Sequence, residues 1–255
     1  MTTVTRRDGR GPCEMRGKEL RASDLSQFDG SVWYSQGLTA VCVAINGPTA
    51  ARQENYRRCT LNVRVSRMSR IPPAGGTDRL AVMEKRERQQ RADGEMEQFL
   101  AGLAEAVVQL DRFPRCVLEV NVMVLMDDGA LLAVAANAMM CALLDAGVPC
   151  HSTVAAVSLL LCVPAKTEDE ETPVLLLDPT AAEESTDEVR SYAAATFVLM
   201  NSSDGVVASD VHMRPRSSAY SRPVTPKELN AMIALAAKAT ETIFTFFRNC
   251  GVPLE

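Results

Sequence analysis

The sequence lacks the features of membrane, secreted and zinc-binding proteins. Its polar, charged start has no apolar core of a signal peptide, and its apolar runs stop well short of the roughly 18 to 20 residues that a membrane helix needs. The 8 cysteines include no CxxC pair of zinc ligands, and several stand inside apolar runs, where cysteine acts as a small hydrophobe. We therefore expect reduced cysteines, no metal and a place in the cytoplasm, the nucleus or both.

Basic residues are too few for a free-standing nucleic-acid binder. The 27 Lys and Arg face 32 Asp and Glu, which gives a formal net charge of -5. Binding to a phosphate backbone needs a clustered excess of cations. The densest basic cluster consists of Lys85, Arg86, Arg88 and Arg91. Because Glu84 and Glu87 interrupt this cluster, we expect a solvated helix face, with contact to RNA phosphates inside an assembly as the alternative.

Apolar content is what the sequence does have. At 255 residues and 47% hydrophobic, the chain is long enough to bury a large core without disulfides. Helical and strand patterns alternate and no change of composition divides the chain, so we expect one α+β domain over residues 1–255. The patterns predict strands at 40–45, 61–67, 116–126, 154–163, 174–177, 196–200 and 206–211, and helices at 80–110, 130–146 and 225–249.

Two of these predictions depend on clear local signals. The segment 130–146 is apolar nearly all round, so it predicts a buried central helix, with Gly147 as its C-terminal cap. The last helix begins with Thr225-Pro226-Lys227-Glu228, a capping box with proline at the tolerant first position. In the first predicted strand, Asn46-Gly47-Pro48 marks the expected end.

Several short motifs, spread in order over nearly the whole chain, carry a family resemblance. They are Arg6-Arg7-Asp8-Gly9-Arg10 with Arg16, Asp29-Gly30-Ser31, Ser35-Gln36-Gly37-Leu38-Thr39-Ala40-Val41, Gly47-Pro48, Arg52-Gln53-Glu54, Asp127-Asp128-Gly129, Asn137-Ala138, 142–149 and Asp178-Pro179-Thr180. Together they resemble the RNase PH family, and the run from Asp128 to Gly147 is most similar to the non-catalytic Rrp46-type ring subunit of the eukaryotic RNA exosome. The fold implied is the RNase PH-like β-α-β-α domain, with β-sheets and packed helices.

The resemblance fails where active family members hold phosphate. Those members carry glycine, threonine and arginine at the entry to the central helix, whereas this chain has Gly129-Ala130-Leu131-Leu132-Ala133. The preceding helix should offer arginines, yet the sequence has none from Asp93 to Leu110. Apolar side chains cannot neutralise a phosphate, and a helix dipole is a weak substitute for a guanidinium. We therefore predict that the chain is not an enzyme.

Two carboxylates are the exception. Asp178 aligns with a family carboxylate, and Glu184 stands where active members tend to have Asp, so the pair are candidates for a vestigial acidic site. In the alternative interpretation, which we favour, Asp178-Pro179-Thr180 is a turn at a strand end and Glu183 and Glu184 lie at a polar turn or helix start.

The resemblance also implies a function. It is that of a non-catalytic structural subunit of the RNA exosome ring, which supports 3′-to-5′ RNA processing and decay, including rRNA processing, by helping to form the RNA channel. The implied partners are other RNase PH-like ring subunits, cap subunits and single-stranded RNA in the channel, with no cofactor and no membrane, in the nucleus, nucleolus and cytoplasm. The alternative is an active phosphorolytic 3′-to-5′ exoribonuclease. A small-molecule enzyme is disfavoured because the sequence has no glycine-rich phosphate loop.

Overall fold

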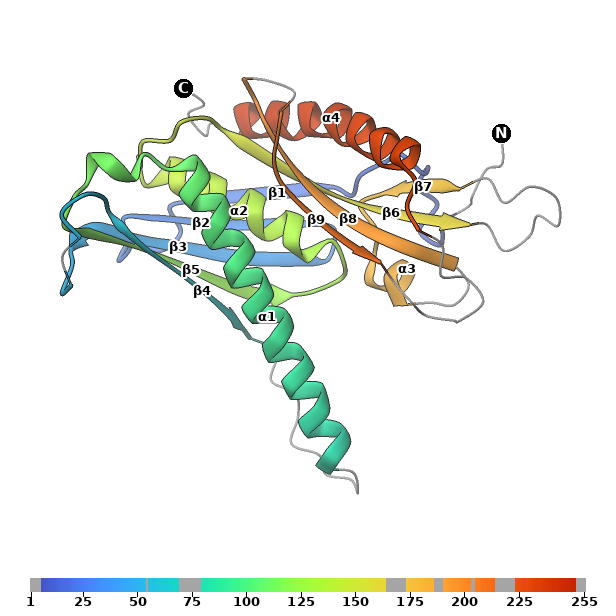
Figure 1. Ribbon diagram of the computed structural model, residues 1–255, viewed down its shortest axis with the longest axis horizontal. Helices are drawn as coiled ribbons and strands as arrows, with labels where there is room; N and C mark the ends of the chain where they lie inside the picture. Colours follow the sequence, from blue (N-terminus) through green and yellow to red (C-terminus); the bar gives the residue numbers. More distant parts are fainter. Residues whose placement is uncertain are drawn as a thin grey trace.

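The computed structural model describes residues 6–53, 55–68, 79–163, 173–185, 190–202, 205–213 and 223–250. Within them the chain forms two sheets (Figure 1). The first has the order β1 (Lys18–Ala22), β2 (Gly30–Gln36), β3 (Thr39–Ala50), β5 (Cys116–Met126) and β4 (Thr60–Arg67). The second has the order β7 (Val174–Leu177), β6 (Val154–Val163), β8 (Arg190–Met200) and β9 (Val206–Met213). The expected α+β class is confirmed.

Helices pack between and beside the two sheets. They are α1 (Arg79–Val107), α2 (Leu131–Asp145), the short α3 (Ala181–Ser185) and α4 (Pro226–Asn249), with a 3-10 turn at Leu110–Arg112. Helix α2 contacts β2 and β3 of one sheet and β6 of the other, whereas α4 covers β6 and β8. The second half of α1 packs on β4, and its first half extends away from both sheets (Figure 1). In the described part of the chain, no helix is long and apolar enough to span a membrane.

Helix α2 is the predicted central helix. Every residue from Ala133 to Leu143 is buried, because the helix is enclosed by both sheets. Gly147 ends it with a positive φ of 65°, and the N–H groups of Gly147 and Val148 donate to the carbonyls of Leu144 and Leu143 at 3.1 and 3.0 Å. This is a Schellman cap, as the glycine predicts. The capping box of Thr225 and Glu228 at the start of α4 is also present.

Strands β4 and β5 run parallel, whereas the other neighbouring strands of the first sheet pair antiparallel. Along β5, Leu118, Val120, Val122 and Val124 are buried on one face, while Met123 and Met126 are exposed. The expected end of the preceding strand at Asn46 is wrong. Strand β3 continues to Ala50, and a register irregularity between Asn46 and Thr49 leaves Gly47 and Pro48 without partners in β5, so proline is accommodated without ending the strand.

One large cluster of buried apolar residues joins both sheets, α1, α2 and α4. A single domain over residues 1–255 stays a prediction. The helix predicted over 80–110 ends at Val107, because the chain then pairs with the segment after α2, where the Val107 carbonyl accepts from His151 N–H at 2.7 Å. The second half of α1 is amphipathic, with Leu100, Leu103 and Ala104 buried and Glu105 exposed.

Candidate functional site

Two tight turns meet at the start of α2. One follows β5 through Asp127, Asp128 and Gly129, and the other follows β7 through Asp178 and Pro179 into α3. Gly129 has a φ of 87°, and a Cβ there would lie 2.5 Å from the Ala181 nitrogen, so only glycine fits this close approach. The Ala181 N–H donates to the Asp128 carbonyl at 3.0 Å. The start of α2 and the acidic segment are therefore held together.

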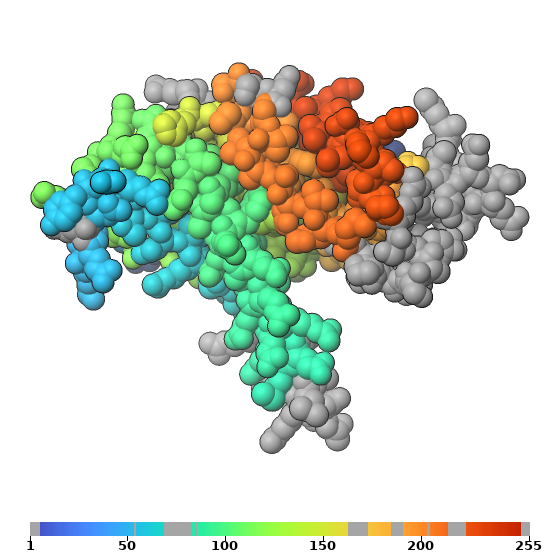
Figure 2. Space-filling view, in the orientation of Figure 1, coloured from blue at the N-terminus to red at the C-terminus, as the bar shows by residue number. Residues whose placement is uncertain are grey.

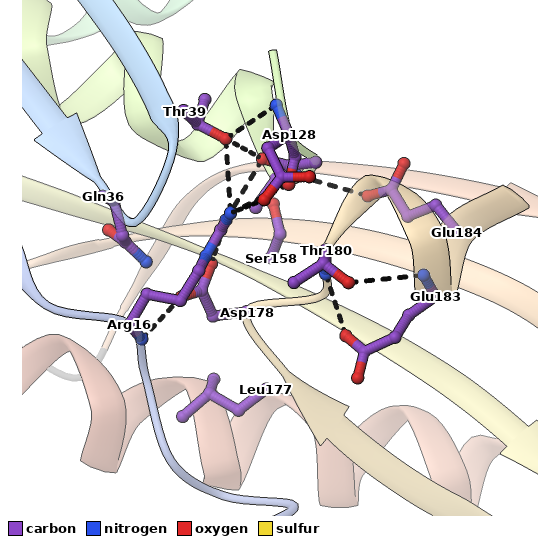
Figure 3. A network of polar contacts seen from close by, with 12 residues as sticks. Arg16, Gln36, Thr39, Asp128, Ser158, Leu177, Asp178, Thr180, Glu183 and Glu184 are labelled. Carbon is purple, nitrogen blue, oxygen red and sulfur yellow. Dashed lines mark hydrogen bonds and ion pairs between the residues drawn. The ribbon is translucent and has the colours of Figure 1, made fainter. Parts of the chain in front are cut away.

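Asp178 is a buried ion-pair partner. It is 1% exposed, and its two carboxylate oxygens accept from Arg16 Nη2 at 2.7 Å and Nε at 3.0 Å, with a further bond from the Arg16 backbone N–H at 2.8 Å (Figure 3). Burial acts to raise the pKa of Asp178, but the hydrogen bonds and charge of Arg16 outweigh it, so the pKa lies below its ordinary value. These bonds hold the Asp178 carboxylate in place, so it is not available to act as an acid or to bind a ligand.

Arg16 also ties the β5–α2 turn to this pair. Its guanidinium donates to the carbonyls of Asp128 and Gly129 at 2.8 and 3.2 Å. Thr39, the first residue of β3, supports the same turn by donating to the Gly129 carbonyl at 2.8 Å and accepting from Asp128 N–H at 3.1 Å (Figure 3). Arg16, which belongs to the N-terminal motif that carries the family resemblance, therefore has a structural role in holding the β5–α2 turn.

A second buried pair lies one turn away. Arg6 holds Glu183 through two contacts of 2.7 Å, and its remaining N–H groups donate to the carbonyls of Leu177 and Asp178 at 2.8 and 2.9 Å. Burial acts to raise the pKa of Glu183, but the hydrogen bond from Arg6 lowers it below its ordinary value. Arg10 lies nearby, with Nη1 3.6 Å from Asp178 Oδ2. The N-terminal arginines therefore clamp the β7–α3 turn.

Glu184 reaches the start of α2. Its Oε1 accepts from the Ala130 N–H at 3.2 Å (Figure 3). The first N–H groups of a helix are unsatisfied by the helix itself and attract anions, and Ala130, as the N-cap, has no side chain that caps them. The position that favours an anion is thus occupied by a carboxylate of the same chain.

A cavity of about 220 Å³ opens beside this helix start. Its walls include the carboxylates of Asp127, Glu184 and Asp210 together with the side chain of His212. Among the described residues, its lining contains no Lys or Arg. The cavity therefore offers an anionic substrate carboxylates in place of the guanidinium groups that stabilise phosphate.

The predicted RNA-binding cluster lies on the first half of α1. Arg86, Arg88 and Arg91 are exposed there, and Arg88 forms an ion pair of 3.4 Å with Glu84. The side chain of Lys85 lies outside the described residues. The first half of α1 extends away from both sheets and from α3 (Figure 1), so the structure does not bring the cluster together with Asp178 and Glu184.

A second basic surface was missed by the sequence reasoning. Residues 51–53 and 55–59 are joined to 110–115 by backbone hydrogen bonds such as Arg115 N–H to the Asn55 carbonyl, 2.8 Å. We call the arginines they expose the basic edge: Arg52, Arg57, Arg58, Arg112 and Arg115. The Arg115 guanidinium stacks 4.8 Å from the ring centre of Tyr56, which is 69% exposed. The signal in the sequence was Tyr56-Arg57-Arg58, an aromatic beside two arginines.

The chain resembles proteins of known family over most of its length. The model of domain 1 of the 3′ exoribonuclease family, RNase PH, matches residues 14–149. Human exosome complex component MTR3 is 31% identical over 215 residues, covering 75% of this chain and 68% of that protein. The Arabidopsis thaliana exosome complex exonuclease RRP46 homolog is 31% identical over 183 residues, 71% of this chain and 66% of that protein. The crystal structure of rice Rrp46 superposes with a TM-score of 0.72 at 24% identity, covering 95% of this chain and 98% of that one.

Proposed function

The chain belongs to the 3′ exoribonuclease family of RNase PH proteins, and we propose that it is a non-catalytic structural subunit of the RNA exosome ring. In this role it supports 3′-to-5′ RNA processing and decay by forming part of the RNA channel with other RNase PH-like subunits and with cap subunits. The observation that carries the proposal is the Glu184 carboxylate at the N-terminus of α2.

Phosphorolysis needs a phosphate dianion beside the end of a polyanion. At the start of α2 that dianion would meet Glu184, Asp127 and Asp210. Like charges within a few ångströms repel strongly at partly buried positions, where water screens them least. Asp178 and Glu183 are engaged by Arg16 and Arg6, so moving either carboxylate toward a substrate would break a buried ion pair. These features support structural rather than catalytic use of the acidic residues.

The basic edge and the first half of α1 supply the RNA contacts in this proposal. Both carry exposed arginines that reach phosphates without being buried. At the basic edge, Tyr56 adds an exposed ring on which a base can stack. We assign Lys85, Arg86, Arg88 and Arg91 a weaker contact with the RNA backbone, because Glu84 and Glu87 offset their charge.

An assay of phosphorolysis tests the absence of catalysis. The purified chain is incubated with uniformly labelled single-stranded RNA, inorganic phosphate and Mg²⁺, and labelled nucleoside diphosphates are measured. We expect none above a blank without protein, and the same for Glu184→Gln, because removing one carboxylate does not supply the missing arginines. Phosphate-dependent release of diphosphates by the wild-type chain would establish the alternative, an active phosphorolytic exoribonuclease.

Affinity purification tests the assembly. A tagged full-length chain should recover about five further RNase PH-like chains in stoichiometric amounts, together with cap subunits, since related chains close rings through heterologous contacts. Recovery of the chain alone, as a monomer or homo-oligomer, would contradict a place in a hetero-oligomeric ring. The same tagged chain is expected in the nucleus, nucleolus and cytoplasm by microscopy.

A further inference from the structure

A groove with an apolar floor and an acidic rim runs from the start of α2 across α1. Two hollows form it, one of about 220 Å³ and one of about 480 Å³, and they share Leu131, Leu132, Asp210 and His212. The larger hollow is within the range of about 300 to 1,000 Å³ that binding pockets span. We call the two hollows together the acidic groove. Residues of α1 and β9 line it, and these two elements pass beside each other (Figures 1 and 2).

The floor of the groove is apolar although it is open to solvent. Leu131 and Leu132 are half-buried at the start of a helix whose next eleven residues are buried, and Phe99 of α1 is half-buried opposite them. Met96 lies beneath, 6% exposed. When a ligand covers apolar side chains that are partly exposed in a concave surface, the free energy of the complex is lowered.

The rim carries carboxylates from four separate segments. Glu95 belongs to α1, Asp127 to the turn after β5, Glu184 to α3 and Asp210 to β9. Arg67 is the single Arg or Lys among the described lining residues, and it is shared between Asp93 at 2.6 Å and Asp127 at 2.8 Å. His212 pairs with Asp210 at 2.7 Å. The groove therefore has an excess of negative charge around its apolar floor.

We propose that the acidic groove binds a segment of a partner protein in which apolar side chains are flanked by Lys or Arg. The apolar side chains would cover Leu131, Leu132 and Phe99, and the cations would meet Glu95 and Asp210. An extended segment fits because β9 is the edge strand of its sheet and, in the described chain, pairs with β8 alone. RNA is disfavoured as the occupant because its phosphates would meet the same carboxylates.

This inference goes beyond the ring-subunit role, since it needs neither RNA nor catalysis. The probe is a fluorescein-labelled peptide, Gly-Arg-Leu-Leu-Arg-Lys-Gly, titrated with the purified full chain and followed by anisotropy. Two control peptides replace the leucines by serines or the cations by glutamates. We expect saturable binding of the first peptide, and binding at least about tenfold weaker for both controls, because each removes one half of the complementarity.

Matched variants locate the site. Glu95→Gln with Asp210→Asn should weaken the first peptide about tenfold, whereas Glu105→Gln with Asp111→Asn, exposed carboxylates away from the groove, should leave it unchanged. In methyl NMR spectra the Met96 resonance should shift with peptide, and that of exposed Met83 should not. These readouts do not depend on the phosphorolysis assay, so failure of one proposal leaves the other standing.

Three outcomes would overturn the proposal. Equal affinity for the three peptides, or for both pairs of variants, would show that the groove does not select its ligand. If oligouridylate displaces the peptide and reverses the shift of the Met96 resonance, the groove binds RNA instead. Dimerisation of the chain in sedimentation experiments, lost in the Glu95→Gln and Asp210→Asn variant, would assign it to a second copy.

Discussion

The two ends of the β4–β5 strand pair carry opposite charge. Before the strands begin, Arg57, Arg58 and Arg115 are exposed beside Tyr56. At the other end, Asp127 follows β5 and lines the acidic groove. The two ends are roughly 35 Å apart, because β5 has 11 residues. We infer that the sheet attracts a phosphate backbone at one end and repels it at the other. In an active enzyme of this family, the end of the sheet at Asp127 would hold phosphate. The contrast between the two ends therefore distinguishes a subunit that guides RNA from one that cleaves it.

The two ends also differ in how their charges are held. At the groove end, the ion pairs of Arg16 with Asp178 and of Arg6 with Glu183 are buried and bind the turns together. At the basic edge the arginines lie in solvent, where an ion pair such as Arg58 with Glu105, at 3.8 Å, contributes little to stability. Substitutions at the groove end should therefore act mainly on stability, and substitutions at the basic edge mainly on RNA binding.

The largest effect is expected for Asp178→Ala. Removing this carboxylate leaves the Arg16 guanidinium buried without its ionic partner, which should lower the free energy of unfolding by about 3–5 kcal/mol. Urea denaturation measures the loss, with exposed Asp111→Ala as the matched control that should change little. The double variant Arg16→Met, Asp178→Leu should recover much of the stability. A loss as small as that of the control would show that the pair does not anchor the turns.

The same pairs predict loss of stability in acid. Asp178 and Glu183 have folded-state pKa values below their ordinary values, whereas the unfolded chain titrates near the ordinary values of about 3.9 and 4.3. Their stabilisation is therefore complete above these unfolded-state values, and it is lost as pH falls from about 5 through the lower folded-state values. Urea titrations from neutral to acid pH should show a shallower decline for Glu183→Gln than for the wild type. Parallel declines would contradict this origin of the acid sensitivity.

The sequence predicted the groove end less well than the core. Helices α2 and α4 and strand β5 followed from regular apolar patterns and caps, which are local signals. The partnership of Arg16 with Asp178 joins residues 162 positions apart, and no local pattern reports such a contact. Strand β1 was missed because it is an edge strand, largely exposed, whose Lys18-Glu19-Leu20-Arg21 has no apolar alternation. Strand β2 was missed by pattern because it buries polar residues such as Ser31, Ser35 and Gln36.

At the basic edge, the arginines come from separate segments. Arg57 and Arg58 stand beside each other in the sequence, but Arg112 and Arg115 join them through the backbone contacts of 51–53 and 55–59 with 110–115. The favoured alternative for Asp178, a turn at a strand end, describes its location after β7 and not its burial. The role of Glu184 at the start of α2 required the fold, because it depends on how α3 is placed against that helix.

A smaller effect is expected at the basic edge. Arg57→Gln, Arg58→Gln and Arg115→Gln together should weaken binding of single-stranded RNA by the assembled ring about tenfold, with little sequence preference. The slope of log affinity against log salt should fall by about 0.7 for each lost phosphate contact. Thermal unfolding of the isolated variant should match the wild type. An unchanged salt slope in the intact ring would remove the basic edge from the RNA path.

The smallest effect is expected on the first half of α1. Arg86→Gln, Arg88→Gln and Arg91→Gln together should weaken RNA binding by only about twofold to threefold, because Glu84 and Glu87 already offset the cluster. Filter binding at several salt concentrations, with the basic-edge variant measured in parallel, ranks the two surfaces. A larger loss here than at the basic edge would reverse the comparison.

Photo-crosslinking within the assembled ring tests the central claim most directly. RNA containing 4-thiouridine is bound to the ring, irradiated, and its crosslinked peptides are identified by mass spectrometry. We predict crosslinks in this subunit at the basic edge, with Tyr56 the foremost candidate because its ring is exposed beside Arg115. The acidic groove should yield none. Crosslinks at Leu131, Leu132 or His212 would place the RNA end in the groove and contradict a non-catalytic, RNA-guiding role.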